Sequence, residues 1–399
     1  MTTKAIITDN NAAARTILLR ILAVASCLVL FQGYLVAPLI PALTADLHAP
    51  AAILGLAVPA YTIPYGLSTL FYGPLSDRLG RKPVLLSLLG MMTAATFVLA
   101  FSRSAYMFLG IRVLAGLATG GIVPIAIALL GDLYPYEERG KPIGLLYSAM
   151  ACGVMLGSTL GAYLNPLIGW RMEFMITSVL CGLVLALAVF YRKLFSASQR
   201  VTPMPFKALL SAGYQLLSGE KGRSLYSYVF LNGMFHSGVF AWLGYYFSIR
   251  YHLNDQGIGL ALLGYGLPGV LLGVSIGKLA DRYGRKKLIP IGLFIGALTV
   301  TVLIFHFPLW MTAIAVGCLS LGYDMTQPLF AGLVTSLGSH ASRGLAVGLS
   351  AAMLFLGYGI GALTFQFLLQ FSMNTALVTF VGLEVCLFLR SLFVFRKFK

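Results

Sequence analysis

Twelve apolar runs, each long enough to cross a membrane, account for most of this chain of 399 residues. A helix needs roughly 20 mostly apolar residues to cross the hydrocarbon core of a bilayer. Hydrophobic residues make up 59% of the chain and charged residues only 10%, which excludes an ordinary soluble domain. The predicted spans are 16–39, 51–72, 83–101, 105–131, 142–165, 170–191, 224–248, 257–276, 288–307, 309–334, 344–370 and 374–395.

The positions of the basic residues predict the orientation of these spans. An even number of spans places both termini on one side of the membrane. Of the 28 lysines and arginines, all except Arg103, Arg112, Arg171 and Arg250 fall on that side. Because cytoplasmic loops collect such residues, we expect both termini in the cytoplasm. The same distribution explains the net charge of +16 without nucleic acid as a partner.

The longest polar segment lies between the sixth and seventh spans. We expect an N-terminal six-helix bundle over 1–193, a cytoplasmic linker over 194–222 and a C-terminal six-helix bundle over 223–399. The start of the chain is polar, and the first span is longer than a signal-peptide core, so the start is interpreted as a cytoplasmic tail. Apolar residues between Phe206 and Leu217 suit a helix lying flat on the membrane, and a flexible linker is an equal alternative.

A ten-residue motif occurs twice in the chain. Residues 73–82 read GPLSDRLGRK, and residues 277–286 read GKLADRYGRK, a shift of 204 residues. The same shift aligns Tyr61 with Tyr265 and Gly157 with Gly361. Because six helices separate the copies, both halves have the same orientation in the membrane, as in parallel repeats.

The repeated motif resembles the loop signature of the major facilitator superfamily. The sequence LGIRVLAGLATG around Arg112 is similar to the family's fourth-helix arginine motif. Gly153 and Gly157 belong to a stretch close to the antiporter motif G-x-x-x-G-P-x-x-G-G, with Ser158 and Ala162 replacing proline and glycine. The resemblance implies an all-α membrane protein, with twelve transmembrane helices in two pseudo-symmetric six-helix bundles. It is closest in style to drug:proton antiporters and sugar-efflux permeases.

The charged residues of the first repeated loop are predicted to form a cytoplasmic gate. Asp77 and Arg81 are four residues apart and can meet on one helical face. Asp77 can also lie at the positive N-terminal end of a facing helix, which the resemblance places at span eleven. The resemblance also suggests that Arg81 pairs with Asp132, whereas the second copy has Ser336 there, so we predict a stronger charge network in the N-terminal half. The other predicted gating residues are Gly73, Gly153, Gly157, Asp281 and Arg285.

Ionisable residues inside a membrane are costly and are therefore functional candidates. Asp324, in the middle of span ten, is the first choice for proton coupling or for binding a cationic substrate. Glu384 in span twelve is the second choice, with a structural role equally plausible. Arg112 is predicted to bind substrate or to assist proton release, or alternatively to bond to backbone carbonyls. His236 is a weaker proton-coupling candidate, because a lone membrane histidine more often completes hydrogen bonds in a core.

By the resemblance, spans one, four, seven and ten line a central cavity, with contributions from spans two and eight. An aromatic cavity with few charges suits a moderately hydrophobic or amphipathic substrate, although simple packing explains each aromatic equally well. The predicted substrate-binding residues are Gln32, Tyr34, Tyr61, Tyr65, Arg112, Asn232, His236, Trp242, Tyr265, Asp324 and Gln327.

Together these features predict a proton-coupled exporter of a small, drug-like organic molecule that works as a monomer in the cytoplasmic membrane of a bacterium. A proton symporter or facilitator for a sugar or an organic acid is the alternative. An enzyme is not expected, because the histidines are scattered and no H-E-x-x-H or Walker-type motif occurs. No metal or cofactor is expected, since the five cysteines lie apart in apolar runs. A sensor would need an output domain, for which the chain has little room.

Overall fold

The computed structural model describes residues 2–134, 138, 140–193, 206–337 and 343–395, and these residues form helices and connecting turns without a strand. The first part of the chain forms α1 (Thr2–Asp46), α2 (Ala51–Leu54), the 3-10 helix η1 (Gly55–Ala57), α3 (Pro59–Leu79), α4 (Arg81–Leu99), α5 (Ala105–Thr119), α6 (Ile122–Leu133) and α7 (Gly140–Phe190). The remainder forms α8 (Phe206–Ser218), α9 (Glu220–Tyr251), α10 (Asp255–Leu262), α11 (Leu267–Tyr283), α12 (Arg285–Ile304), α13 (Leu309–Asp324), α14 (Gln327–Val334), α15 (Arg343–Leu369) and α16 (Met373–Val394).

The twelve predicted spans all fall on helical segments. Within the described residues, nine segments are long and apolar enough to cross a membrane by these criteria alone. The count is below twelve because α7 holds two predicted spans, joined at Gly169, whose φ of 77° bends the chain out of helical geometry. The segments α9 and α13–α14 are helical but miss the criteria, and both contain several polar residues.

Spans four and ten are both interrupted near their middle. The first break separates α5 from α6 at Gly120 and Gly121, and the second separates α13 from α14 at Met325 and Thr326. The repeat shift of 204 residues pairs Gly120 with Asp324, the last residue of α13. Related positions of the two halves therefore interrupt the helix at the same depth, and one of them carries a carboxylate.

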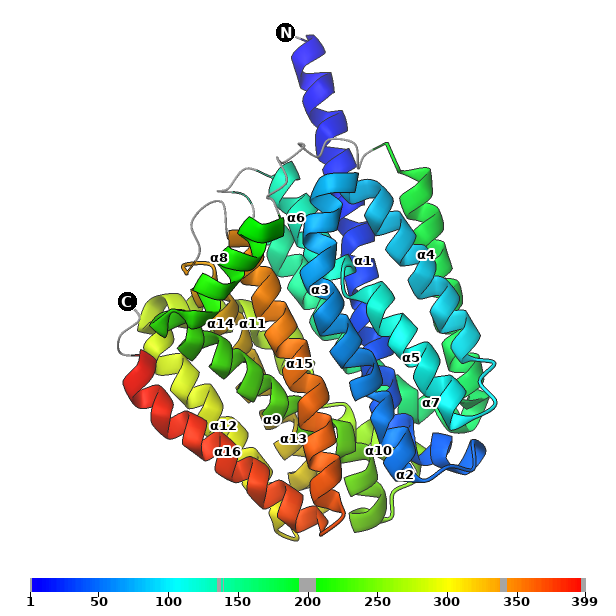
Figure 1. Ribbon diagram of the computed structural model, residues 1–399. Helices are drawn as coiled ribbons and strands as arrows, with labels where there is room; N and C mark the ends of the chain where they lie inside the picture. The colour runs from blue at the N-terminus through cyan, green and yellow to red at the C-terminus, as the bar shows by residue number, and fades with distance from the viewer. Residues whose placement is uncertain (1, 135–137, 139, 194–205, 338–342, 396–399) are drawn as a thin grey trace.

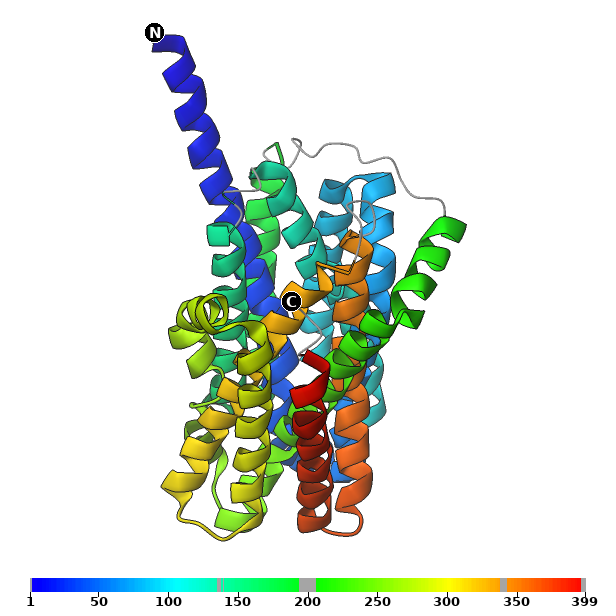
Figure 2. The same cartoon turned by 90° about the vertical axis from the view of Figure 1, so that its left-hand side faces the viewer.

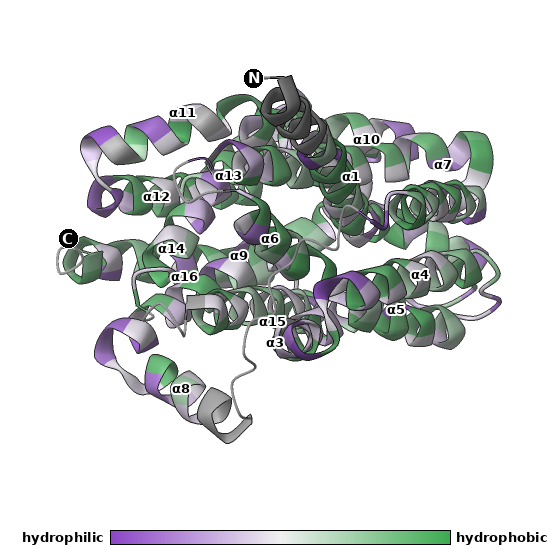
Figure 3. Ribbon diagram, turned by 90° about the horizontal axis from the view of Figure 1, so that it is seen from above, coloured by the Kyte–Doolittle hydropathy of each residue, from purple (hydrophilic) through white to green (hydrophobic). Residues whose placement is uncertain are grey.

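The helices lie side by side in one bundle, from which the start of α1 projects (Figures 1 and 2). Seen from above, α4, α5 and α7 lie on one side, α12, α14 and α16 on the other, and α3, α9 and α15 near the middle (Figure 3). We call α1–α7 the first, or N-terminal, group and α9–α16 the second. Contacts of α1 with α9, α3 with α15 and α7 with α11 join the two groups. We call the end with the α3–α4 and α11–α12 turns the basic end, and the end with α2 and the α12–α13 turn the far end.

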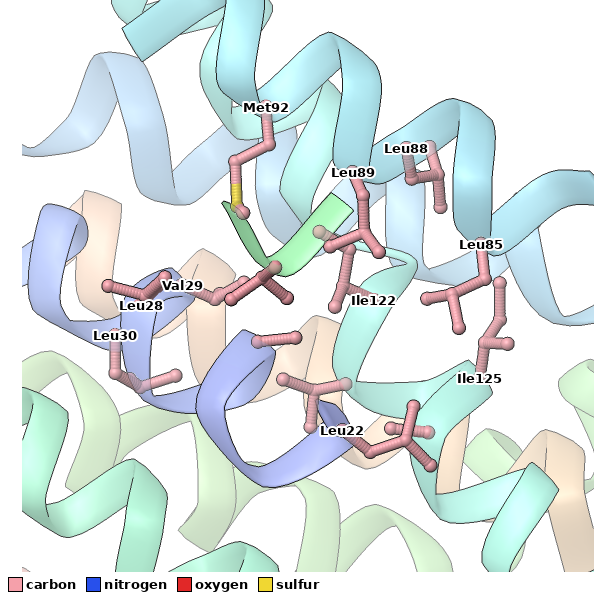
Figure 4. Packing of buried hydrophobic residues seen from close by; sticks show 14 of the residues in the cluster. Leu22, Leu28, Val29, Leu30, Leu85, Leu88, Leu89, Met92, Ile122 and Ile125 are labelled. Atoms are coloured by element: carbon pink, nitrogen blue, oxygen red, sulfur yellow. The ribbon is translucent and has the colours of Figure 1, made fainter. Parts of the chain in front are cut away.

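Apolar side chains fill the space inside the first group. Figure 4 shows this packing between α1, α4 and α6. Residues of the cluster are Leu22, Leu28, Val29, Leu30, Leu85, Leu88, Leu89, Met92, Ile122 and Ile125. Such close packing, rather than removal of apolar surface from water, holds helices together within a membrane.

Glycines bring several helix backbones into direct contact. A Cβ added at Gly116 would lie 2.2 Å from the carbonyl oxygen of Tyr61. One added at Gly153 would lie 2.2 Å from that of Cys27, and one at Gly361 would lie 2.1 Å from that of Met234. At these points no side chain larger than hydrogen fits unless the helices separate.

Candidate functional site

A central pocket lies between α1, α3, α9 and α15, and both groups of helices contribute to its wall. Three of the predicted substrate-binding residues, Tyr34, Tyr61 and Tyr65, line this pocket. The other polar and aromatic lining residues are Thr62, Ser237, Phe240, Phe355 and Tyr358. The lining carries hydroxyl groups and aromatic faces but no charged residue.

Aromatic contacts join the two groups of helices across the central pocket. Tyr65 of α3 stacks on Phe355 of α15 with ring centroids 3.8 Å apart. Tyr34 of α1 lies 4.8 Å from Phe240 and 6.3 Å from Tyr265, again between ring centroids. The aromatic surface is therefore made of two halves that can separate, with faces suited to a flat or cationic organic molecule.

Asp324 lies at the edge of this aromatic surface, where span ten is broken. Its carboxylate accepts a hydrogen bond from Ser320 at 3.3 Å and lies against Gly269 of α11. The adjacent Tyr323 is hydrogen-bonded through its hydroxyl to that of Tyr358, which lines the central pocket. Among the described residues no lysine or arginine forms an ion pair with Asp324. An acidic group of this kind is free to bind a proton or a cation.

Arg112 is fully buried in the N-terminal group and does not line the central pocket. Its guanidinium donates to the carbonyl oxygens of Ala57 and Gln32, both at 3.1 Å. The ring of Tyr61 lies 4.3 Å from its central carbon. Of the roles predicted for Arg112, bonding to backbone carbonyls matches this geometry, and Tyr61 is the group that presents a surface to the pocket.

Gln32 and Tyr61 are held by the same polar cluster. Thr96 donates to the side-chain oxygen of Gln32 at 2.8 Å. The Tyr61 hydroxyl accepts from Thr119 at 2.9 Å and donates to the carbonyl oxygen of Val29 at 3.2 Å. These bonds fix the pocket face of Tyr61, so this residue is pre-positioned rather than adaptable.

The remaining predicted residues of the C-terminal half lie at different depths. The Asn232 amide bonds across the helix break to Thr326 at 3.2 Å and to Gln327 at 3.4 Å. His236 is buried, with its ring 5.2 Å from that of Tyr323.

Trp242 lies away from the pocket, against Gly55, so its prediction as a pocket residue does not fit this conformation. Glu384 is buried between α12 and α16, off the pocket.

At the basic end, the charged residues of the first repeat form the expected contacts. Arg81 lies 2.9 Å from Asp132 and 3.8 Å from Asp77. In the second repeat, Arg285 lies beside Gly332, and the Ser336 hydroxyl donates to the carbonyl oxygen of Leu333. The side chain of Asp281 lies outside the described residues. The structure thus places an acid on α6 beside Arg81 and a serine at the matching position of the second half.

The interface between the two groups is closed at the far end. Gln366 of α15 donates to the carbonyl oxygen of Ala52, and Asn165 of α7 donates to Asp255 of α10 at 2.6 Å. A Cβ at Gly244 of α9 would lie 3.0 Å from the backbone of Pro38 of α1. These contacts lie between elements that must separate if the central pocket is to open at this end.

Toward the basic end, some glycines at this interface pack against the facing helix and others do not. Gly66 of α3 packs against Ala352 of α15, but a Cβ at Gly73 or Gly344 would have no atom within 4 Å. Likewise Gly266 of α11 packs against Met155 of α7, whereas Gly277 faces open space. The contact expected between Asp77 and the start of α15 stays a prediction, because residues 338–342 and the side chain of Arg343 lie outside the described part of the chain.

Sequence reasoning missed the part of the wall formed by α15. Phe355 and Tyr358 line the central pocket, and span eleven was not among the spans expected to do so. Their three-residue spacing places both on one helical face, a signal that the sequence does contain. It was not recognised because span eleven has many other apolar residues of similar size.

Comparison with known proteins places this fold in a family. A family model described as Major Facilitator Superfamily matches residues 22–255 and 225–398. The chain belongs to the Major Facilitator Superfamily. As the sequence predicted, the protein is a multi-pass membrane transporter and not an enzyme.

Relatives within the superfamily include proteins named for efflux. The chain is 28% identical over 371 residues to the uncharacterized MFS-type transporter YceJ of Bacillus subtilis (strain 168), covering 91% of each. It is 23% identical over 333 residues to the quinolone resistance protein NorA of Staphylococcus aureus (strain COL), covering 82% of this chain and 84% of NorA. It is also 25% identical to the efflux pump dotC of Dothistroma septosporum, covering 80% of this chain and 54% of that protein.

Solved structures confirm the predicted fold class. The crystal structure of a D-xylose-proton symporter matches with a TM-score of 0.76 at 17% identity, covering 94% of this chain and 97% of that one. The human organic anion transporter MFSD10 (TETRAN) matches with a TM-score of 0.74 at 19% identity, covering 94% and 99%. At these identities the likeness concerns the fold alone.

Proposed function

We propose that this superfamily member exports a small, amphipathic, drug-like molecule in exchange for protons. The observation that carries this proposal is the position of Asp324, an acid without an ion-pair partner among the described residues, beside the tyrosines of the central pocket. A single carboxylate that binds either a proton or a cationic substrate couples the two fluxes, because the two ligands exclude each other.

The described conformation corresponds to one step of the proposed cycle. In the proposed cycle the pocket opens toward the basic end and admits substrate from the side of the basic loops, which we assign to the cytoplasm. Substrate binding displaces the proton from Asp324 toward the cytoplasm. Opening of the far end, by release of the Asn165–Asp255 and Gln366–Ala52 contacts, then exposes the substrate to the outside. A proton from outside replaces it, and the far end closes again.

The moving bodies in this proposal are the two predicted bundles, 1–193 and 223–399. Glycines bring helix backbones into direct contact within each group, at Gly153 with Cys27 and at Gly361 with Met234. The helix α8 lies beside α9 and α15, and we assign it to the cytoplasmic surface of a bacterial membrane. The protein is proposed to work as a monomer, since the central pocket is complete within one chain.

Two observations bear on the direction of transport. Relatives named as an efflux pump and a quinolone resistance protein support export of an organic molecule. The alternative, a proton symporter for a sugar or organic acid, is favoured by Ser158, which stands where the antiporter motif has proline. Ser158 donates to the carbonyl oxygen of Met155 within a continuous stretch of α7. This part of span five therefore has no kink caused by a proline.

The test is transport by the purified protein in liposomes with an imposed pH gradient, using ethidium as a cationic probe and xylose as an uncharged one. We expect ethidium to accumulate against its own gradient on the side of the membrane with the higher proton concentration. The variant Asp324→Asn should abolish that accumulation. The matched control is Glu220→Gln, which removes an exposed acid at the start of α9. Proton-driven flux of xylose without ethidium flux would favour the symporter instead. Accumulation retained in Asp324→Asn would remove this residue from the coupling mechanism.

A further inference from the structure

Glu384 is a second buried acid, and the proposed cycle does not use it. It lies midway along α16 with none of its surface exposed, and neither carboxylate oxygen has a hydrogen-bond partner in the described structure. An ionised carboxylate enclosed in apolar surroundings is strongly disfavoured, so such a group either pairs with a cation or takes up a proton.

The carboxylate lies where small residues leave room between helices. Its Oε1 is 3.2 Å from the position of a Cβ on Gly296 of α12, and the ring of Phe235 is 3.1 Å from the same position. On its other side Gly296 packs against Gly322 of α13, two residues before Asp324. In this way α9, α12, α13 and α16 meet at two glycines, with Glu384 at the α16 side and Asp324 near the α13 side.

His236, next to Phe235 on α9, is a further buried titratable residue of this half. It is 1% exposed, and both ring nitrogens lack a hydrogen-bond partner in the described structure. Its ring contacts that of its neighbour Phe235 at 5.0 Å and that of Tyr323 at 5.2 Å. Tyr323 in turn bonds to Tyr358 of the pocket wall. Neither His236 nor Glu384 lines the pocket itself.

The groups around Glu384 favour a proton over a larger cation. On α16 the nearest basic residue is Arg390, whose guanidinium lies over the ring of Tyr228 on α9. The hydroxyl of Tyr228 donates to the carbonyl oxygen of Leu387. The other titratable group on the part of α9 that faces α16 is His236. The membrane part of α12 has no charged residue from Leu288 to Ile304, and α13 contributes Asp324. No group of three metal-binding side chains occurs among the described residues. A sodium ion would need several oxygen ligands, whereas Gly296 and Phe235 offer none at the carboxylate.

We propose that Glu384 is a second proton-binding site, enclosed in the C-terminal half and separate from the substrate pocket. Proton binding forms an O–H bond on the Glu384 carboxylate, and release breaks that bond and returns the proton to water. Substrate competes with the proton at Asp324 but not at Glu384. This proposal rests on the proposed function in one respect, namely that protons drive transport.

The direct test is infrared spectroscopy of the purified protein near neutral pH, where a protonated carboxyl group has its own C=O stretching band. We expect the wild type to show a band that Glu384→Gln removes, that Asp324→Asn leaves in place and that ethidium does not alter. Gly296→Ala places a methyl group against the Glu384 carboxyl group and should shift the frequency of the band. This variant provides the test if Glu384→Gln does not fold. If neither substitution changes a carboxyl band, the proposal is wrong.

A transport measurement separates this proposal from the proposed function. With Glu384→Gln, we expect accumulation of ethidium driven by a pH gradient to fall by about tenfold or more, while downhill exchange of ethidium stays within about twofold of wild type. Glu220→Gln should match the wild type in both assays. If the wild type itself does not accumulate ethidium, the proposed function fails, and the infrared result still decides whether Glu384 holds a proton. Full accumulation in Glu384→Gln would overturn the second site alone.

Discussion

Arg81 at the start of α4 lies 2.9 Å from Asp132 near the end of α6, and this ion pair joins the two helices at the basic end. Both side chains are mostly buried, with 10% and 15% of their surface exposed. Loss of Asp132 leaves the partly enclosed Arg81 with only its longer contact to Asp77, which costs more than the loss of an exposed pair.

We therefore expect Asp132→Asn to lower stability by about 1–3 kcal/mol and to change the balance between inward-open and outward-open states. The matched variant Ser336→Ala, at the corresponding place of the second half, removes only a hydroxyl that bonds within its own helical turn. Thermal unfolding and the labelling rate of a single cysteine near the pocket measure the two effects. Equal behaviour of the two variants would show that the charge network is not stronger in the N-terminal half.

Two glycines of α15 provide a matched test of helix packing. A Cβ at Gly361 would lie 2.1 Å from the carbonyl oxygen of Met234, whereas one at Gly348 would have no atom within 4 Å. We expect Gly361→Ala to destabilise the protein by about 1–3 kcal/mol through overpacking. Gly348→Ala should be neutral or stabilise it by up to about 1 kcal/mol, because alanine is the better helix former. Thermal unfolding of both purified variants checks this, and similar melting temperatures would contradict the described α9–α15 contact.

The contacts that close the far end predict which cysteine pairs can be linked. In a variant lacking the five native cysteines, Asn165→Cys with Asp255→Cys should be joined readily by a short crosslinker, since the native side chains are hydrogen-bonded at 2.6 Å. Gly73→Cys with Gly344→Cys should resist the same reagent, because both positions face open space. Gel mobility reports both reactions. Efficient linkage at the basic end without linkage at the far end would mean that the resting protein has the opposite conformation.

The stacked pair Tyr65 and Phe355 is expected to contribute to substrate affinity. Aromatic stacking is worth about 0.5–1.5 kcal/mol beyond area burial, so Tyr65→Leu should weaken ethidium binding by about two- to tenfold. Tyr65→Phe keeps the ring and should bind nearly as well as the wild type. Tyr106→Leu makes the same change at a side chain that is 74% exposed and serves as the control. Fluorescence anisotropy of ethidium measures all four affinities, and an unchanged affinity in Tyr65→Leu would exclude this ring from the binding surface.

Much of the fold could be predicted because membrane spans and repeats leave direct signals in a sequence. Apolar run lengths located the helical segments, and the shift of 204 residues between Asp77 and Asp281 fixed the relation of the halves. The contacts of Arg81 with Asp77 and Asp132 followed from helical spacing and from the family resemblance. The breaks of spans four and ten were not predicted, since a glycine pair and the stretch after Asp324 look like ordinary membrane sequence.

Side-chain direction is what the sequence did not determine for the site. Arg112 was placed in a cavity by its span number, but the helix turns its guanidinium toward the backbone carbonyls of Ala57 and Gln32. Trp242 was assigned by the same reasoning, and it lies in the far-end closure against Gly55, because it is five residues, about one and a half turns, nearer that end than Ser237 of the pocket wall. Depth along a helix and rotation about its axis decide such contacts, and a span boundary known to within several residues defines neither.

The most direct test of the central claim, that Asp324 exchanges a proton for substrate, is proton release from the purified protein in weakly buffered solution. Addition of ethidium to the wild type should release close to one proton for each molecule bound, measured with a pH indicator alongside the binding signal. Asp324→Asn should release none, whether or not it still binds ethidium. Proton release of the same size from Asp324→Asn and from the wild type would contradict the claim.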